Sequence, residues 1–178
     1  MLKNKDVLFI LEPSDTLTQK VAAMKTEVAN TIGSYESRYS KAHITLWDAA
    51  NLSPYLIDHL ISVNEKYVRA IRPQTLVAGG LNSFSEKFPY TVFIPLEETS
   101  TINKWFNELY NAIRHNKRTP HITIARGLQL EQRHSIFRLF KDFKINESFT
   151  PNGITVLVRD TFDHNSHWKP HKTRCFNQ

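Results

Sequence analysis

The chain carries one short pattern twice. A histidine, an isoleucine, a threonine and an aliphatic residue follow one another at 43–46 and again at 121–124. Both copies lie in apolar runs typical of β-strands, where residues i and i+2 point to the same face. The histidine and threonine of each copy therefore share one face, and the aliphatic residues fill the other. If two similar halves bring the copies together, two imidazoles and two hydroxyls line one cleft.

These four side chains suit an in-line displacement at phosphorus. One of His43 and His121, as a neutral imidazole, can take a proton from the attacking oxygen, while the other gives a proton to the departing oxygen. The hydroxyls of Thr45 and Thr123 can donate hydrogen bonds to the non-bridging oxygens as charge accumulates there. This chemistry needs neither a metal ion nor another cofactor. The alternative is structural, with each histidine satisfied inside a core beside a threonine that favours strands.

The surrounding sequence predicts the same order of elements in both halves: strand, helix, strand with the histidine, helix, strand. Strands are expected at 6–12, 42–47, 75–78, 90–96, 119–126, 154–158 and 172–176. Helical stripes run over 17–32, 57–71, 102–113 and 136–143. Ser53 and Pro54 are expected to begin the second helix, and Pro95 favours an edge position for its strand. Without a Gly/Ser-rich linker, we expect one domain, 1–178, made of two lobes.

Composition limits the class of protein. The 178 residues are 40% hydrophobic, which is enough for a sizeable core. The net charge of +6 favours anionic ligands such as phosphate or nucleic acid. No apolar run approaches the roughly 18–20 residues needed to span a bilayer, and the run after the N-terminus is too short for a signal peptide. A single cysteine, Cys175, excludes an internal disulfide. We expect a soluble, cytoplasmic protein without a membrane or an obligate protein partner.

The two motifs, with Pro120 before the second and Arg126 after it, resemble the two-histidine (2H) phosphoesterase superfamily. Within it they are most similar to the bacterial 2′-5′ RNA ligase and RNA 2′,3′-cyclic phosphodiesterase (LigT-like) group. The resemblance covers nearly the whole chain in element order. It implies an α+β fold with a bilobal, pseudo-two-fold duplication, in which helices flank two antiparallel sheets around a central cleft.

The resemblance also implies a function and its residues. The expected activity is metal-independent hydrolysis of a 2′,3′-cyclic phosphate or 2′-5′ phosphodiester at an RNA end or nucleotide, with reverse 2′-5′ ligation also possible. His43 and His121 are then catalytic, with His43 as the acid and His121 as the base. Thr45 and Thr123 hold the phosphate, and Arg126 binds phosphate or base.

Aromatic and cationic residues beside the motifs are further candidates for lining the cleft. They are Tyr35, Arg38, Tyr39 and Lys41 before the first motif, Trp47 after it, and Lys117 and Arg118 before the second. Exposed loops without a functional role are the alternative. Relatives often carry an aromatic residue two positions beyond the leucine of the first motif, where this chain has Asp48.

Other histidines invite a metal-binding interpretation. His164, His167 and His171 occur in a polar turn, and the pattern specifies no sequence-distant carboxylate as a further ligand, so a hairpin loop is expected there and no metal site. His59, His115 and His134 fall within helical patterns and are expected at the surface.

Two other functions stay open from the sequence. The same cleft can bind a nucleotide or RNA phosphate without turnover, although binding alone tolerates Asn or Gln in place of the histidines. The same acid–base pair can also serve another pathway, for example on cyclic phosphates of ADP-ribose.

Overall fold

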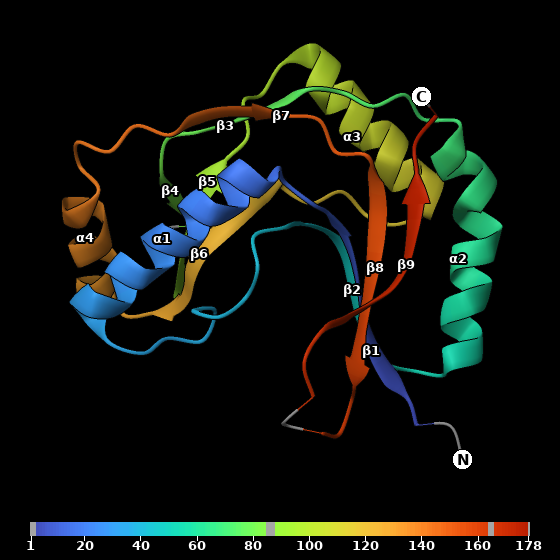
Figure 1. Cartoon of the computed structure of the whole chain (residues 1–178), viewed down its shortest axis with the longest axis horizontal. Coiled ribbons are helices and arrows are strands. Elements are labelled where there is room, and N and C mark those ends of the chain that lie inside the picture. The colour runs from blue at the N-terminus through green and yellow to red at the C-terminus, as the bar shows by residue number, and fades with distance from the viewer. Residues whose placement is uncertain (1–2, 85–87, 164–165, 178) are drawn as a thin grey trace.

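The computed structural model describes residues 3–84, 88–163 and 166–177. In chain order (Figure 1), the elements are Lys5–Leu11 (β1), Asp15–Ile32 (α1), Ile44–Leu52 (β2), Pro54–Arg69 (α2), Leu76–Gly79 (β3), Asn82–Phe84 (β4), Tyr90–Pro95 (β5), Ser100–Ile113 (α3), His121–Leu128 (β6), Leu130–Leu139 (α4), Asn146–Phe149 (β7), Gly153–Asp160 (β8) and Lys169–Cys175 (β9). Within the described residues these make two antiparallel sheets flanked by helices, which confirms the expected α+β class.

Side-chain caps begin three of the helices. The hydroxyls of Ser14, Ser53 and Thr99 each accept a hydrogen bond from the backbone N–H three residues on, at 3.3, 3.2 and 3.1 Å. Such a cap satisfies one of the donors that the first helical turn leaves free. Pro54 follows its cap at the first helical position, as the sequence predicts.

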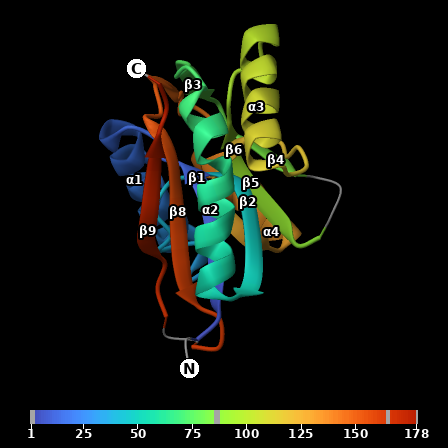
Figure 2. The same cartoon turned by 90° about the vertical axis from the view of Figure 1, so that its right-hand side faces the viewer.

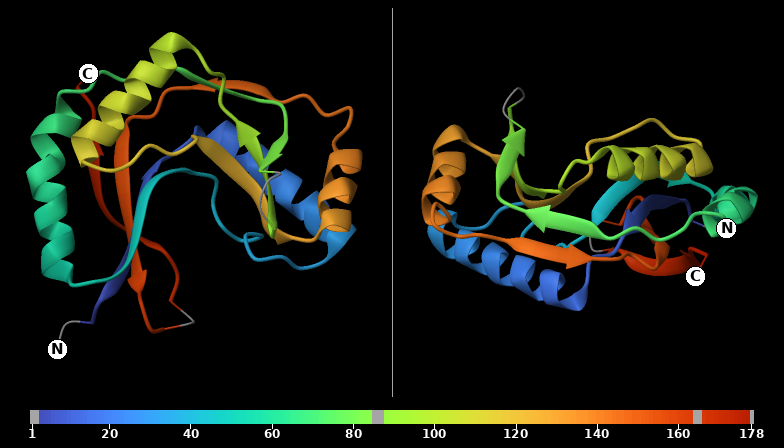
Figure 3. Two further views of the ribbon diagram at one scale, coloured as in Figure 1. Left: turned by 180° about the vertical axis from the view of Figure 1, so that it is seen from behind. Right: turned by 90° about the horizontal axis from the view of Figure 1, so that it is seen from above.

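The larger sheet has the strand order β4-β5-β6-β2-β1-β8-β9 and consists of two parts. One part is β4-β5-β6 and the other is β2-β1-β8-β9. Among the described residues, a single pair joins β2 to β6, with Ile44 opposite Ile122. Beyond that pair the strands diverge, and Figures 1 and 3 show the two parts at an angle to each other. β3 and β7 form a separate two-stranded sheet.

The helices are exchanged between the two parts. α1 follows β1 in the chain but packs on α4 and β6, and α3 follows β5 but packs on α2. Figure 3 shows α1 and α4 together at one end of the molecule and α2 and α3 together at the other. In Figure 2, α2 lies in front of β1, β2 and β8. The β4-β5-β6 part is thus covered by α1 from the other segment of the chain, and α3 packs on α2, which covers the β2-β1-β8-β9 part (Figure 2).

The hydrophobic core lies on the helix-covered face of the large sheet, here called the helix face. On β1 the alternate residues Val7, Phe9 and Leu11 belong to the core cluster, while Leu8 and Ile10 between them do not. Ile44 and Ile122 are fully buried in the same cluster. The opposite face of the two central strands is therefore the one that carries the motif histidines and threonines.

One expectation about the sheet is wrong. Pro95 favoured an edge strand, yet β5 lies between β4 and β6. β4 is short and pairs only with Thr91 to Phe93 of β5. Pro95 lies beyond these paired residues, so its missing N–H interrupts no hydrogen bond to β4. β4 and β7 were not predicted, because they are short and mostly polar, with sequences NSF and NESF, and so carry no apolar run.

No helix in the described part of the chain is both long and apolar enough to cross a membrane.

The junction of the two parts should be sensitive to truncation. We expect Ile122→Ala to lower the free energy of unfolding by about 2–5 kcal/mol, because it leaves a cavity where the side chain is fully buried. Urea denaturation followed by circular dichroism measures the change. Ile102→Ala in α3, where the side chain is only partly buried, is the control and should cost clearly less. Equal losses in both variants would contradict this account of the junction.

Candidate active site

The register between β2 and β6 brings the two motifs together. Ile44 pairs with Ile122 in an antiparallel ladder, so one step along each strand sets the histidine of one motif opposite the threonine of the other. The two strands diverge beyond this pair, so the register fixes the shared face of these four residues. Because both isoleucines lie on the helix face, the motif polar residues share the opposite face. We call this the histidine face, and it carries His43, Thr45, His121 and Thr123.

Both histidines are held in the same way. The Nδ1 atom of His43 lies 2.8 Å from the carbonyl oxygen of Lys41, and Nδ1 of His121 lies 2.8 Å from that of Thr119. A carbonyl only accepts, so Nδ1 must carry the hydrogen and donate it. In the neutral ring the free lone pair is then on Nε2. Each imidazole is thus fixed in the tautomer that can take a proton at Nε2.

The surroundings lower the pKa of both imidazoles. For His43 the largest cause is burial, and the positive charges of Lys25, His121 and Arg126 add to it. For His121 the largest cause is again burial, and the charge of Arg118 acts in the same direction. The carbonyl that each ring contacts acts in the opposite direction. His121 acts on His43 through its charge, so the two protonation states are coupled.

A β-bulge follows each motif at the same place. In β2 the register shifts between Thr45 and Trp47, and in β6 it shifts between Thr123 and Ala125. One extra residue on the bulged strand changes which face the following side chains occupy. The duplication therefore extends beyond the motifs into the irregularities of the two strands.

Arg126 follows the bulge of β6, and its charge reaches His43. Its guanidinium donates from Nη2 to Oε1 of Glu36 at 2.8 Å, and its backbone N–H donates to Oγ of Ser37 at 3.2 Å. Glu36 and Ser37 belong to the loop before the first motif. This loop therefore covers the edge of β6 that β2 leaves unpaired.

An equivalent ion pair forms on the other strand, with the anion on the strand and the cation in the loop. Asp48, which follows the bulge of β2, forms an ion pair with Arg118 in the loop before the second motif. The carbonyl oxygen of Arg118 accepts a hydrogen bond of 3.1 Å from the hydroxyl of Tyr110. In both cases a residue after one motif pairs with the loop before the other, so the two ion pairs connect the two parts of the molecule.

Trp47 does not lie on the histidine face, contrary to the expectation that it lines the substrate site. It pairs with Phe9, a residue of the helix-face core, at a ring distance of 5.2 Å. Its ring also stacks on His115 at 4.1 Å and 11°. Simple alternation from Thr45 predicts Trp47 on the histidine face, but the bulge between them moves its side chain to the helix face. His115 itself is not in a helix, because α3 ends at Ile113.

The remaining candidates before the first motif differ in their contacts. Tyr39 is 85% exposed, with the guanidinium of Arg38 5.0 Å from its ring centre. Lys41 pairs with Glu12 at 3.2 Å, and its carbonyl oxygen holds His43. The side chain of Lys41 is thus directed to Glu12, while its backbone orients the histidine.

Two phenylalanines contact His121, and the motif pattern did not indicate them. The rings of Phe84 and Phe93 both have centres 5.0 Å from the imidazole. Phe93 pairs with Thr123 across β5 and β6 and is buried, whereas Phe84 is 38% exposed. Alternation along 90–95 could have pointed to Phe93, but β4, which carries Phe84, is too short to detect. His43 has no aromatic contact among the described residues.

The described residues contain no group of three or more His, Cys, Asp or Glu suited to a metal ion. Of the three histidines considered as ligands, His164 lies outside the described residues. His171 instead contacts Asp58, with 2.8 Å between Nε2 and Oδ1.

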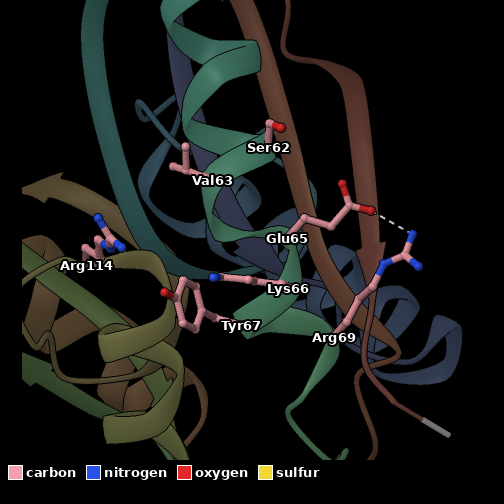
Figure 4. Close-up of a pocket in the computed structure, with 7 residues that line it drawn as sticks. All are labelled: Ser62, Val63, Glu65, Lys66, Tyr67, Arg69 and Arg114. Atoms are coloured by element: carbon pink, nitrogen blue, oxygen red, sulfur yellow. Dashed lines mark ion pairs between the residues drawn. The ribbon is translucent and has the colours of Figure 1, made fainter.

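A surface pocket of about 630 Å³ lies elsewhere, between α2 and the end of α3 (Figure 4). It is lined by Ser62, Val63, Glu65, Lys66, Tyr67, Arg69 and Arg114. Lys66 and Arg114 lie 4.8 and 5.7 Å from the centre of the Tyr67 ring. These cations stand at the C-terminal ends of two helices, whose partial negative charge they offset. No lining residue belongs to the histidine face.

Comparisons with known proteins give the family and the fold. A family model described as the 2′-5′ RNA ligase superfamily matches residues 13–163. The chain belongs to the 2′-5′ RNA ligase superfamily. The resemblance to the 2H phosphoesterases is thereby confirmed. Comparison of sequences alone finds no match among curated proteins.

Solved structures of this superfamily share the fold across the whole chain. E. coli LigT complexed with phosphate has a TM-score of 0.67 at 12% identity, with 99% of each chain covered. E. coli LigT complexed with 3′-AMP has a TM-score of 0.69 at 12% identity, covering 99% of this chain and 100% of that one. The protein TT0787 of Thermus thermophilus has a TM-score of 0.68 at 11% identity, covering 96% of this chain and 97% of that one. At these identities the likeness concerns the fold.

The lowered histidine pKa values predict how stability depends on pH. Above the ordinary pKa of about 6.5 both rings are neutral, folded or unfolded. As the pH falls through that value the unfolded chain takes up protons that folded His43 and His121 do not, so the free energy of unfolding decreases until the folded-state pKa values are reached. Urea denaturation at pH 7.5 and 5.5 measures the decrease. The double variant His43→Ala/His121→Ala should lose less stability between these pH values than wild type, and an equal loss would contradict the lowered pKa values.

Proposed function

We propose that the chain is a metal-independent phosphodiesterase that hydrolyses a 2′,3′-cyclic phosphate or a 2′-5′ phosphodiester of an RNA end or nucleotide. One observation carries the proposal: two histidines, each with Nδ1 on a backbone carbonyl, share one face with two threonines across a single antiparallel pair. Membership of the 2′-5′ RNA ligase superfamily supports it. The same chemistry in reverse is a 2′-5′ ligation.

The reaction needs one histidine in each protonation state. The base takes a proton from water at Nε2 while the water oxygen attacks phosphorus, and the acid gives its proton to the departing ribose oxygen. The phosphate oxygens then carry more negative charge, which the hydroxyls of Thr45 and Thr123 stabilise by donating hydrogen bonds. Arg126 contributes its charge after its guanidinium exchanges Glu36 for a phosphate oxygen.

The division of labour between the histidines is testable. The family resemblance assigns His43 as the acid and His121 as the base. The charges around the free protein favour the reverse, since Lys25 and Arg126 both act on His43 whereas Arg118 acts on His121. A bound phosphate adds negative charge that stabilises the protonated form of either imidazole, so it permits His43 to be the acid. We therefore keep the assignment that the family resemblance implies as the proposal.

The ligand class rests on chemistry and on relatives. The site offers two hydroxyls and an exchangeable guanidinium around the two imidazoles, which suits a phosphodiester anion. Phosphate, 3′-AMP, ATP and NADP+ are the ligands named for E. coli LigT structures. The net charge of +6 favours approach of such anions.

Hydrolysis should survive chelation. We expect a nucleoside 2′,3′-cyclic phosphate to be converted to the monophosphate in excess EDTA at the same rate as without it, because acid, base and charge stabilisation all come from side chains. Chromatography of the products over time measures the rate. Loss of activity in EDTA with recovery on adding a divalent ion contradicts metal independence. Tight binding without any product identifies a binding module instead.

Each histidine should be required for turnover. His43→Ala and His121→Ala are expected to lower kcat/KM by roughly 10²-fold or more, and the pH profile of the wild type should be bell-shaped with two imidazole limbs. Thr45→Ala and Thr123→Ala each remove a single hydrogen-bond donor and should cost less than loss of a histidine. His59→Ala, in an exposed position of α2, is the control and should keep wild-type kcat/KM. Wild-type activity in both histidine variants contradicts a catalytic role.

A substrate with a nitrophenyl leaving group separates acid from base. Such a leaving group departs without protonation, so it should partly restore the variant that lacks the acid and leave the variant that lacks the base inactive. With His43 as the acid, the restored variant is His43→Ala. Restoration of His121→Ala alone reverses the assignment.

A further inference from the structure

Lys25 is a buried cation on a helix stripe that is otherwise apolar. It lies on α1 four residues after Val21 and three before Val28, both in the core. The whole residue is only 3% exposed. A lysine is almost never buried to this extent unless its ammonium group is satisfied.

The ammonium is satisfied by one turn of the loop that precedes the first motif. Nζ donates to the carbonyl oxygen of Ser37 at 3.0 Å, and to the carbonyl oxygen and Oγ of Ser40, both at 2.8 Å. These three bonds use its three N–H groups. Within residues 3–84, 88–163 and 166–177 no carboxylate forms an ion pair with it. Lys25 therefore holds both ends of the 37–40 turn through neutral oxygen atoms.

The same turn is bound to the histidine face at two places. Oγ of Ser37 accepts from the backbone N–H of Arg126, and the neighbouring Glu36 pairs with the guanidinium. Just beyond the turn, the carbonyl oxygen of Lys41 accepts from His43. Lys25 thus lies beneath the segment that orients a histidine and an arginine of the proposed site.

The charge of Lys25 also interacts with the charges of His43 and Arg126. It lowers the pKa of His43, and burial together with Arg126 lowers the pKa of Lys25 itself to about 8. Among groups on other elements, the cation of Arg126 on β6 lowers the pKa of Lys25, and Lys25 in turn lowers the pKa of His43 before β2. The carboxylate of Glu36 forms an ion pair with Arg126 and not with Lys25.

We propose that Lys25 is a positioning residue for the phosphodiester reaction: its buried ammonium fixes the 37–40 turn and so sets Arg126 and His43 in the arrangement that receives the phosphate. This role rests on the function proposed above. Lys25 does not touch the substrate and acts through the turn and through its charge.

The test replaces Lys25 with Met, which keeps the length of the side chain and removes the charge and the donors. We expect a folded Lys25→Met protein to show a roughly 10- to 100-fold lower kcat/KM on a nucleoside 2′,3′-cyclic phosphate, the range expected for small misplacement of reacting groups. The pKa of His43, followed by NMR and assigned by the missing signal in His43→Ala, should rise. Lys25→Arg, which keeps the charge and the donors, should keep that pKa near the wild-type value.

Lys20→Met is the matched control, with the same substitution on the same helix at a lysine that pairs with Glu147. It should leave both kcat/KM and the pKa of His43 unchanged. A merely structural role for Lys25 lowers the melting temperature but does not move the titration of His43. A folded Lys25→Met protein with wild-type kcat/KM and an unmoved His43 pKa overturns the proposal.

Two further results keep the outcome decisive. If Lys25→Met does not fold, Lys25→Gln takes its place, because its amide keeps donors for the carbonyl oxygens of the turn and removes the charge. Wild-type kcat/KM together with an unmoved His43 pKa in that folded protein overturns the proposal. If the wild type turns over no substrate, the proposed function fails. Titration of His43 with inorganic phosphate, compared between wild type and Lys25→Met, then decides the role of Lys25. Weaker binding and a raised pKa support it, and identical curves overturn it.

Discussion

The backbone pair between Ile44 and Ile122 is the contact on which the arrangement of this molecule depends. It is the point at which the two parts of the large sheet meet within the described residues. Because each isoleucine is flanked by a histidine and a threonine, one correctly formed pair sets four polar side chains on one face. A shift of register by a single residue turns each strand over and moves its polar residues into the core.

One pair alone does not hold two sheets together, and the rest of the fold supplies the remaining contacts. α1 leaves the part of the sheet from which it comes and packs on β6 and α4 of the other part, and α3 packs on α2. The loops before the two motifs cover the strand edges that diverge, through Glu36 with Arg126 and Arg118 with Asp48. Exposed ion pairs contribute little to stability, so the exchanged helices stabilise the junction while the ion pairs align the loops.

The two motifs are equivalent in sequence but not in surroundings. His43 has the charges of Lys25 and Arg126 nearby, whereas His121 has the charge of Arg118 and contacts the rings of Phe84 and Phe93. An acid–base pair needs one proton between two sites, so equal surroundings are not required for the proposed reaction. The differences arise from residues outside the duplicated pattern. The clearest is the position after each bulge, where β2 carries the anion Asp48 and β6 carries the cation Arg126.

Much of the molecule could be predicted from the sequence. Periodicity of two and of 3.6 residues gave the longer strands and all four described helices, because it reports directly which side chains are buried. The family, and through it the α+β class, followed from two tetrapeptides. The short strands β4 and β7 did not follow, because their mostly polar residues form no apolar run. The position of β5 between two strands did not follow either, because it depends on β4.

The sequence by itself determined which residue types occupy the two central strands, and that a histidine and a threonine share a face in each. Only the tertiary structure decided what else joins them. The bulge after Thr45 moved Trp47 to the helix face, a change that alternation cannot reveal. The fold brought Phe84 to His121 and set Lys25 under the 37–40 turn. These contacts depend on how helices and loops pack across the junction, and local propensity carries no information about that.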